Sequence, residues 1–268
     1  MAADGVWARW RSGLRGCVGV ASTAVLIVAF LTSGSVGAQA QQSIGSAETT
    51  RNDVKRELNA ATAPLNPGET VFRDEVVRTG ADSTSKLVFL DSTNLAVGPI
   101  SRVVLDKFVY DPASTSQTMA INMAKGVFRF TTGVMNKGAY TINTPTAAIG
   151  VRGTVLDIAV DGPHSRVTLR EGEAIVCPRR KDISFAQQVR NCSPQDPKLK
   201  ISRPTAKCDC VDLKQTGQTA NVDRVGGAIR VGLTSSDVQF AALCAGDAGL
   251  CSGDTYASAG GGPALCGK

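Results

Sequence analysis

The cysteines are the residues of this sequence best suited to chemistry, and they gather in one part of the chain. Cys17 lies near the start, and seven others fall in the last third: Cys177, Cys192, Cys208, Cys210, Cys244, Cys251 and Cys266. Thiols bind metals or pair as disulfides, but structural zinc sites usually leave two to four residues between paired ligands, and Cys208 and Cys210 leave one. In an exported chain, bridges are favoured over metal. We therefore predict disulfides, with the pairing left open and one of the seven thiols free or bonded to another chain.

The single histidine is a weak candidate for catalysis. His164 follows Asp161-Gly162-Pro163, a pattern typical of a turn, and the sequence has no Gly-x-Ser-x-Gly elbow that would carry a nucleophilic serine. A lone imidazole in a turn is more often solvated than catalytic. We do not expect serine hydrolysis.

Acidic side chains offer a second enzymatic hypothesis, the paired carboxylates of a glycosidase. The candidates are Asp74, Glu75, Asp157, Glu171 and Glu173. Adjacent charges on strands usually mark solvated edges, and no phosphate-binding loop is present either. We predict a protein that is not an enzyme and has no catalytic residues, cofactor or metal.

Charge gives little support for a nucleic-acid partner. The whole chain has a net charge of +6, and without its first 40 residues the net charge is +4. The densest basic cluster, Arg179-Arg180-Lys181, is followed at once by Asp182, which is typical of a solvated turn rather than a binding stripe.

Residues 1–40 have the three parts of a secretory signal peptide. Three arginines precede an apolar run at 18–31, and Ala38-Gln39-Ala40 supplies a small-residue cleavage site. As a helix, that run is about 21 Å long, short of the ~30 Å that a membrane span needs. We expect cleavage near Ala40 and a periplasmic or otherwise exported protein, with membrane contact only through an uncleaved signal segment.

The rest of the chain has the composition and the residue alternation of a β-sheet protein. Aromatic residues are scarce at 5%, glycine is frequent at 28, and apolar residues alternate with polar ones, as in Met119, Ile121 and Met123. The runs that predict strands are 70–73, 76–79, 86–90, 94–97, 102–110, 118–123, 127–131, 139–143, 155–160, 166–170 and 173–177. Many short strands with turn residues between them favour an all-β sandwich, barrel or β-solenoid.

These patterns also divide the chain. Residues 41–66 are predicted to be a polar lead-in with one possible strand at 50–58, and residues 45–177 to be the β-domain. Residues 178–268 are predicted to be a loop-rich, Cys-rich segment that is partly ordered, with regular structure only at 228–233 and 238–243.

Four stretches of the β-domain resemble one known family. They are GETVFRDEVVRTG at 68–80, LVFLDSTNLAVGP at 87–99, INTPTAAIGVRGT at 142–154 and REGE at 170–173. Together they resemble the FecR domain, here in a stand-alone exported form. The most specific part contains Thr144, Pro145, Thr146, Gly150, Arg152, Gly153 and Thr154.

The signature also has a physical interpretation. Pro145 suits a bend, and Gly150 and Gly153 permit close approach or positive φ. Arg152 carries a rigid fork of donors, so it can either clamp the interior of a structural corner or recognise a partner at the surface. The structural corner is the favoured interpretation.

The resemblance implies two functions. Regulators of this family have a cytosolic anti-sigma segment, a membrane helix and a periplasmic domain that senses an outer-membrane receptor. Only about 16 residues precede the apolar run here, and residues 178–268 do not resemble the receptor-contacting domain. We therefore expect an exported binding or sensory module for an envelope protein or polymer. The alternative is a membrane-tethered FecR-type regulator of sigma-factor and iron-uptake signalling.

Overall fold

The protein is all-β, as the sequence predicted, in a computed structural model that describes residues 41–136, 138–192, 209–223 and 229–233. The strands are β1 (Ser43–Arg51), β2 (Val54–Leu58), β3 (Ala61–Pro64), β4 (Thr70–Phe72), β5 (Glu75–Thr79), β6 (Thr84–Phe89), β7 (Asn94–Val97), β8 (Arg102–Val109), β9 (Thr118–Thr131), β10 (Tyr140–Asn143), β11 (Ala147–Asp161), β12 (His164–Pro178), β13 (Val211–Leu213), β14 (Gln218–Asp223) and β15 (Ile229–Leu233). The helix of the described ranges is α1 (Phe185–Cys192). No helix among the described residues is long and apolar enough to cross a membrane.

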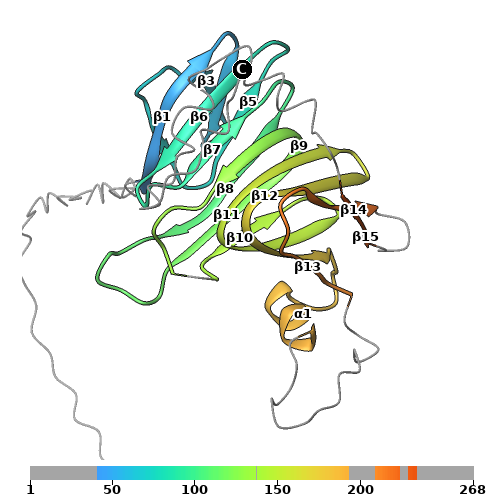
Figure 1. Cartoon of the computed structure of the whole chain (residues 1–268). Coiled ribbons are helices and arrows are strands. Elements are labelled where there is room, and N and C mark those ends of the chain that lie inside the picture. The colour runs from blue at the N-terminus through green and yellow to red at the C-terminus, as the bar shows by residue number, and fades with distance from the viewer. Residues whose placement is uncertain (1–40, 137, 193–208, 224–228, 234–268) are drawn as a thin grey trace, which may run out of the picture. The chain divides into compact units, whose positions relative to one another are not determined.

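Strand pairing arranges these elements as a two-layered sandwich (Figure 1). One layer has the order β3, β2, β5, β8, the first half of β9, β10, the first half of β11, the second half of β12, and β13. The other has the order β4, β1, β6, β7, the second half of β9, the second half of β11, the first half of β12, β14 and β15. The three long strands β9, β11 and β12 therefore each run through both layers.

At one end of the sandwich, which we call the Gly126 end, the chain passes from layer to layer through residues with positive φ. Asn52 (60°) lies between β1 and β2, Asp82 (47°) between β5 and β6, Ile100 (50°) between β7 and β8, and Gly126 (111°) within β9. Positive φ is uncommon outside glycine because Cβ clashes with the backbone. A Cβ on Gly126 would also lie 2.0 Å from the Ser101 Oγ, so this bend requires glycine.

At the opposite end, which we call the Gly153 end, β11 and β12 make the same crossing side by side. β11 bends at Gly153 (φ 58°) and β12 at Gly172 (φ 80°), where the register between the two strands shifts. The sequence predicted two strands at 166–170 and 173–177, and two more at 118–123 and 127–131. In the structure each pair is one continuous strand that bends.

One hydrophobic core fills the space between the layers. Alternate residues of both halves of β9 and β11 point into it, and its largest fully buried side chains include Phe108, Phe128, Phe130, Met119 and Ile149. Period-two alternation therefore produces the buried face, as expected for strands with one face in the core.

Residues 41–66 contribute more than the predicted lead-in. They form β1, β2 and β3, and Ile44, Ala47, Val54 and Leu65 are buried in the core. Their small and polar composition hides this role, because β1 and β2 join the sheet through backbone pairing with β4, β5 and β6.

The described part of the tail joins the same sheet. β14 adds the buried Ala220 and Val222 to the core, and β15 agrees with the predicted structure at 228–233. The helix α1 was not predicted; a Cβ on Gly150 would lie 3.0 Å from the Phe185 ring, so Gly150 permits close approach as expected. The run at 238–243 lies outside the described residues.

A disulfide fastens this tail to the β-domain. Cys177, buried at the end of β12, is bonded to Cys210, which directly precedes β13. Cys192 is disulfide-bonded as well. The remaining predicted cysteines, Cys208, Cys244, Cys251 and Cys266, lie outside the described residues.

Candidate functional site

The hydroxyls of the signature turn between β10 and β11 are structural. Thr144 Oγ1 accepts hydrogen bonds from the Ala147 amide (2.8 Å) and from the Ser165 Oγ (2.8 Å). The single hydroxyl proton of Thr146 has two acceptors within reach, the Ser165 Oγ (2.6 Å) and the Val222 carbonyl (3.1 Å). All three hydroxyl residues are buried, with Pro145 at the bend between the threonines. The network therefore ties β11 to β12 and β14 across the Gly126 end.

Thr154 performs a similar task at the other end. Its Oγ1 donates to the Glu173 carbonyl (2.7 Å), and its amide donates to the Thr132 Oγ1 (2.8 Å), so it holds β9, β11 and β12 together beside the bend. The bends themselves touch, because a Cβ on Gly172 would lie 1.9 Å from the Gly153 carbonyl oxygen. The predicted corner is therefore present.

Arg152 does not clamp this corner. Its side chain is exposed, and the hydrogen bond that the structure gives this residue runs from its backbone amide to Thr154 Oγ1 (2.8 Å). Of the seven signature residues, Arg152 alone presents a charged group to solvent. Because the Arg152 side chain is exposed, it is not the internal clamp of the favoured interpretation, and recognition of a partner at the surface stays a hypothesis.

Five exposed residues lie on the turns and bends of the Gly153 end, and we call this set the corner row: Leu90, Val134, Arg152, Glu171 and Glu173. Leu90 is 59% and Val134 68% exposed, high values for large apolar residues. The Val134 amide donates to the Asp91 carbonyl (2.9 Å), and the Thr132 amide donates to the Thr154 carbonyl (3.0 Å). Hydrogen bonds therefore connect the turns that carry the row.

A buried carboxylate supports the apolar part of the corner row. Asp91 is fully buried and accepts hydrogen bonds from the Thr93 hydroxyl (2.6 Å) and the Tyr140 hydroxyl (2.8 Å). Burial, reinforced by the Asp91 charge, raises the pKa of Tyr140, so this hydroxyl stays protonated as a donor. The Met135 amide in turn donates to the Tyr140 hydroxyl (2.9 Å). Residues around Val134 are thereby held in place.

The predicted acidic candidates do not form a pair with distinct acid and base roles. Asp157 is 1% exposed and is held by Arg129 (Nε to Oδ1, 2.7 Å) and Arg170 (Nε to Oδ2, 2.5 Å). Glu171 and Glu173 are exposed at the bend of β12. Asp157 thus neutralises arginines on a strand, which is a structural task.

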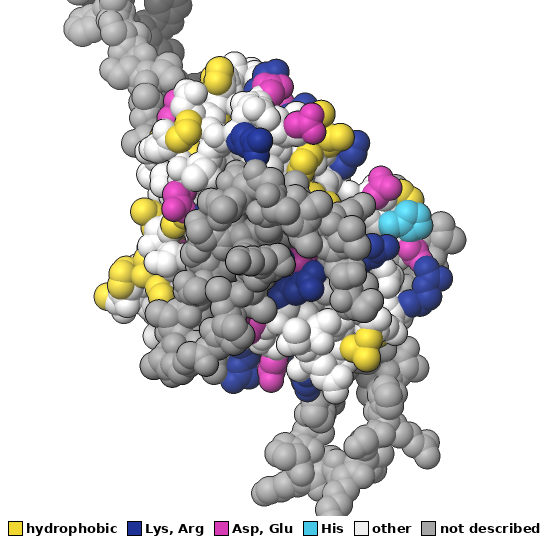
Figure 2. Space-filling model, turned by 45° about the horizontal axis from the view of Figure 1, so that its top comes forward, with side chains coloured by type: hydrophobic (Ala, Val, Ile, Leu, Met, Phe, Trp, Pro, Cys, Tyr) yellow, Lys and Arg dark blue, Asp and Glu magenta, His cyan; other side chains and the backbone are white. Residues whose placement is uncertain are grey.

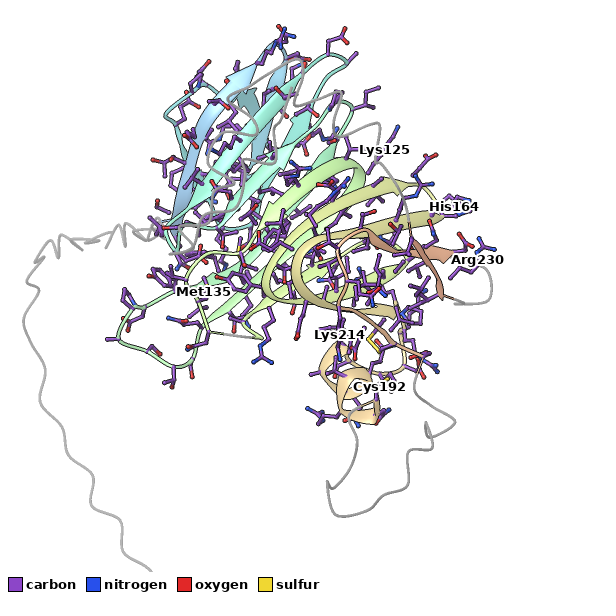
Figure 3. The ribbon with its side chains drawn as sticks, in the orientation of Figure 1. Lys125, Met135, His164, Cys192, Lys214 and Arg230 are labelled. Carbon is purple, nitrogen blue, oxygen red and sulfur yellow. A yellow bond between two sulfur atoms is a disulfide. The ribbon has the colours of Figure 1, made fainter. Side chains whose placement is uncertain are left out.

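His164 lies at the Gly126 end, on the flank where Figure 2 shows the cyan histidine beside acidic and basic side chains. Its Nδ1 is 2.6 Å from the Asp223 Oδ1, and Arg230 Nη2 is 2.6 Å from the Asp223 Oδ2. The hydrogen bond to His164 lowers the pKa of Asp223, with Arg230 adding to the shift. His164 and Arg230 both point outward in Figure 3, and the described residues hold no cluster of three or more potential metal ligands.

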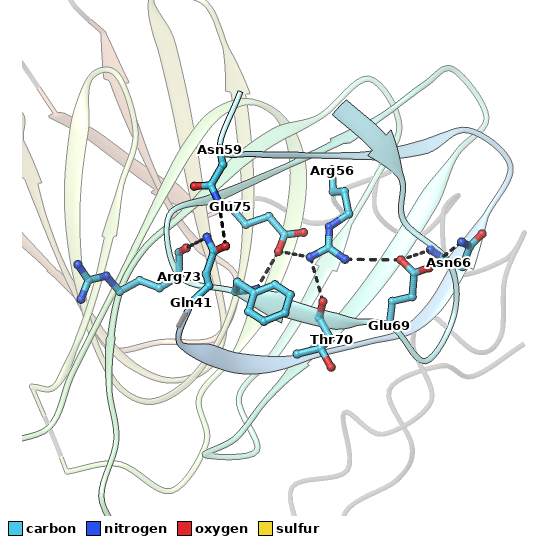
Figure 4. A network of polar contacts seen from close by, with 9 residues as sticks. Gln41, Arg56, Asn59, Asn66, Glu69, Thr70, Arg73 and Glu75 are labelled. Atoms are coloured by element: carbon cyan, nitrogen blue, oxygen red, sulfur yellow. Dashed lines mark hydrogen bonds and ion pairs between the residues drawn. The ribbon is translucent and has the colours of Figure 1, made fainter. Parts of the chain in front are cut away.

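An internal arginine clamp does exist, at a residue that the sequence did not single out (Figure 4). Arg56 Nη2 on β2 lies 2.7 Å from the Glu75 Oε2 on β5 and 3.0 Å from the Thr70 carbonyl on β4. Glu75 is fully buried, also accepts the Phe72 amide (2.8 Å), and leaves Oε1 without a hydrogen-bond partner. Burial raises the pKa of Glu75, opposed by the Phe72 amide and Arg56. Arg56 thus joins the two layers near their edge strands β3 and β4.

Comparison with known proteins gives one family match. Residues 75–174 match the family model described as FecR protein. Two solved structures of a candidate anti-sigma factor from Parabacteroides distasonis ATCC 8503, at 1.65 and 2.50 Å resolution, are each 13% identical to this chain with a TM-score of 0.42. Each covers 63% of this chain, which spans 64% and 63% of their length. No curated protein matches. The matched range holds the whole corner row and every signature residue, and residues 75–174 of this chain are a FecR domain.

Proposed function

We propose that this protein is an exported, non-enzymatic sensory or binding module of the cell envelope, and that the corner row contacts a partner protein. The observation that carries the proposal is that some signature residues are buried and structural while one charged residue is exposed. Thr144, Thr146 and Thr154 are buried in structural networks, whereas Arg152 faces solvent on the same rigid corner.

The composition of the corner row suits a protein partner. Two exposed apolar side chains provide area that gains from being removed from water, and Arg152 provides directional donors for a carboxylate or for backbone carbonyls. The buried Asp91 and Thr154 networks fix the turns beneath the row. A preorganised surface binds with less loss of conformational entropy than a mobile one.

Site-specific crosslinking tests this function. A photo-crosslinking amino acid at position 152 is expected to trap an envelope protein in intact cells, and the same group at Lys107, an exposed position on β8, should trap at least tenfold less. The measurement is the yield of crosslinked adduct on immunoblots, followed by mass spectrometry. Equal yields at positions 152 and 107, or no adduct at either, would contradict the proposed role of the corner row.

The alternative function is a membrane-tethered regulator that passes an envelope signal to transcription, and the FecR domain favours it. The two proposals differ in the fate of residues 1–40. N-terminal sequencing of the protein recovered from cells separates them. A chain that begins at Gln41 contradicts tethering through this segment, whereas a chain that retains its apolar run supports it.

A further inference from the structure

The described sheet has four edge strands, and three of them carry features that prevent pairing with another chain. β3 ends in Pro64; β13 has three residues, including Asp212; and β4 has three residues with a register shift against β1. Proline, charge, short length and irregular register all obstruct the addition of a strand. β15 differs: its sequence is Ile-Arg-Val-Gly-Leu, its register with β14 is regular, and within the described ranges it pairs only with β14.

The apolar side chains of β15 are also exposed. Val231 is 45% and Leu233 76% exposed, whereas Ile229 packs partly against the core. Val231 lies opposite the buried Ala220, and Ile229 opposite the buried Val222. The core-facing side of this layer therefore continues onto β15 and reaches solvent there.

The one charge on β15 is already neutralised. Arg230 Nη2 lies 2.6 Å from the Asp223 Oδ2, on the flank that carries His164 (Figure 3). Arg230 therefore does not act as an unpaired charge that repels a second strand, although lysines and arginines on edges often do.

We propose that β15 pairs antiparallel with β15 of a second copy of this chain, joining two sandwiches through one continuous sheet. The sequence is self-complementary about Val231. In that register Val231 of one copy faces Val231 of the other, Ile229 faces Leu233, and each Arg230 faces Gly232. Apolar pairs meet on one face, and like charges do not lie directly opposite each other. The pairing is identical when it is viewed from either copy, as a two-fold symmetric interface requires. β15 lies outside residues 75–174, so this proposal does not depend on the corner row.

A charge-pairing experiment tests the dimer. The wild-type exported protein is expected to sediment as a dimer at micromolar concentration in analytical ultracentrifugation. Val231→Lys and Val231→Glu each place like charges opposite each other, so each variant alone should dissociate with a dissociation constant at least tenfold higher. An equimolar mixture of the two should form dimers again, since Lys then faces Glu. Val109→Lys, which changes an exposed valine on β8, outside both β15 and the corner row, is the matched control and should stay dimeric.

Several results would overturn the proposal. A wild-type protein that is monomeric up to 100-fold higher concentration excludes self-pairing, whether the edge is occupied by residues 234–268 or by a strand of a different protein. Dimers that persist in both Val231 variants place the interface elsewhere. If a Val231 variant fails to fold by circular dichroism, the Leu233→Lys and Leu233→Glu pair repeats the test at a more exposed position.

Discussion

Replacement of Gly172 by alanine is expected to lower the free energy of unfolding by about 2 to 5 kcal/mol, because positive φ costs an alanine about 1 to 2 kcal/mol and a backbone clash adds about 1 to 3. The new Cβ would lie 1.9 Å from the Gly153 carbonyl oxygen and 2.9 Å from the Thr154 Cα. These are backbone atoms, so the bends of β11 and β12 must separate. Urea denaturation followed by circular dichroism measures the loss.

Gly162→Ala is the matched control for that prediction. Gly162 also has positive φ (50°), but no atom lies within 4 Å of its Cβ position. We expect this change in the β11–β12 turn to cost only about 1 to 2 kcal/mol, from backbone conformation alone. Equal losses for Gly172→Ala and Gly162→Ala would show that the two bends are not in contact.

Arg56→Met is expected to cost about 3 to 5 kcal/mol at neutral pH, because it leaves the fully buried Glu75 carboxylate without its countercharge. Methionine keeps much of the volume and removes the charge. Chemical denaturation at a series of pH values measures the effect.

Because burial raises the Glu75 pKa above its ordinary 4.5, the folded state binds more protons than the unfolded state just above pH 4.5. The contribution of Glu75 to the stability of the wild-type protein is therefore fully present below pH 4.5. It is lost as the pH rises through the pKa of Glu75 in the folded state.

The double variant Arg56→Met, Glu75→Gln separates charge from packing. It removes the buried charge along with its partner, so at neutral pH it should be more stable than Arg56→Met alone, and its stability should vary less between pH 4.5 and 7. A double variant no more stable than Arg56→Met would show that the clamp acts through packing, including the guanidinium 5.4 Å above the Phe72 ring, rather than through charge.

Local patterns in the sequence were sufficient for the fold class, the family and most of the strands. The alternation of Met119, Ile121 and Met123 places a strand in one register only, and all three are buried. Pro145 lies at a bend and Gly150 permits close approach, because such backbone requirements act on a single residue.

Features that depend on distant residues were not predictable in the same way. The bends at Gly126 and Gly172 resemble hairpin turns in sequence, because a glycine with positive φ serves either purpose. The Arg56 clamp joins β2, β4 and β5, and nothing near Arg56 in the sequence marks Glu75 as its buried partner. For Arg152, only the structure distinguishes an internal fork from an exposed one.

The strands that pass through both layers also determine how the domain comes apart. β9, β11 and β12 are covalently continuous across the bends, so neither layer can lose its hydrogen bonds without pulling on the same backbone segments that hold the other. Cooperative unfolding units in proteins are sets of elements that open together. We therefore expect the two layers to open as a single cooperative unit, with exchange of their inner amides requiring opening of the whole sandwich. A partner that binds the corner row would in consequence slow amide exchange at both ends of the domain.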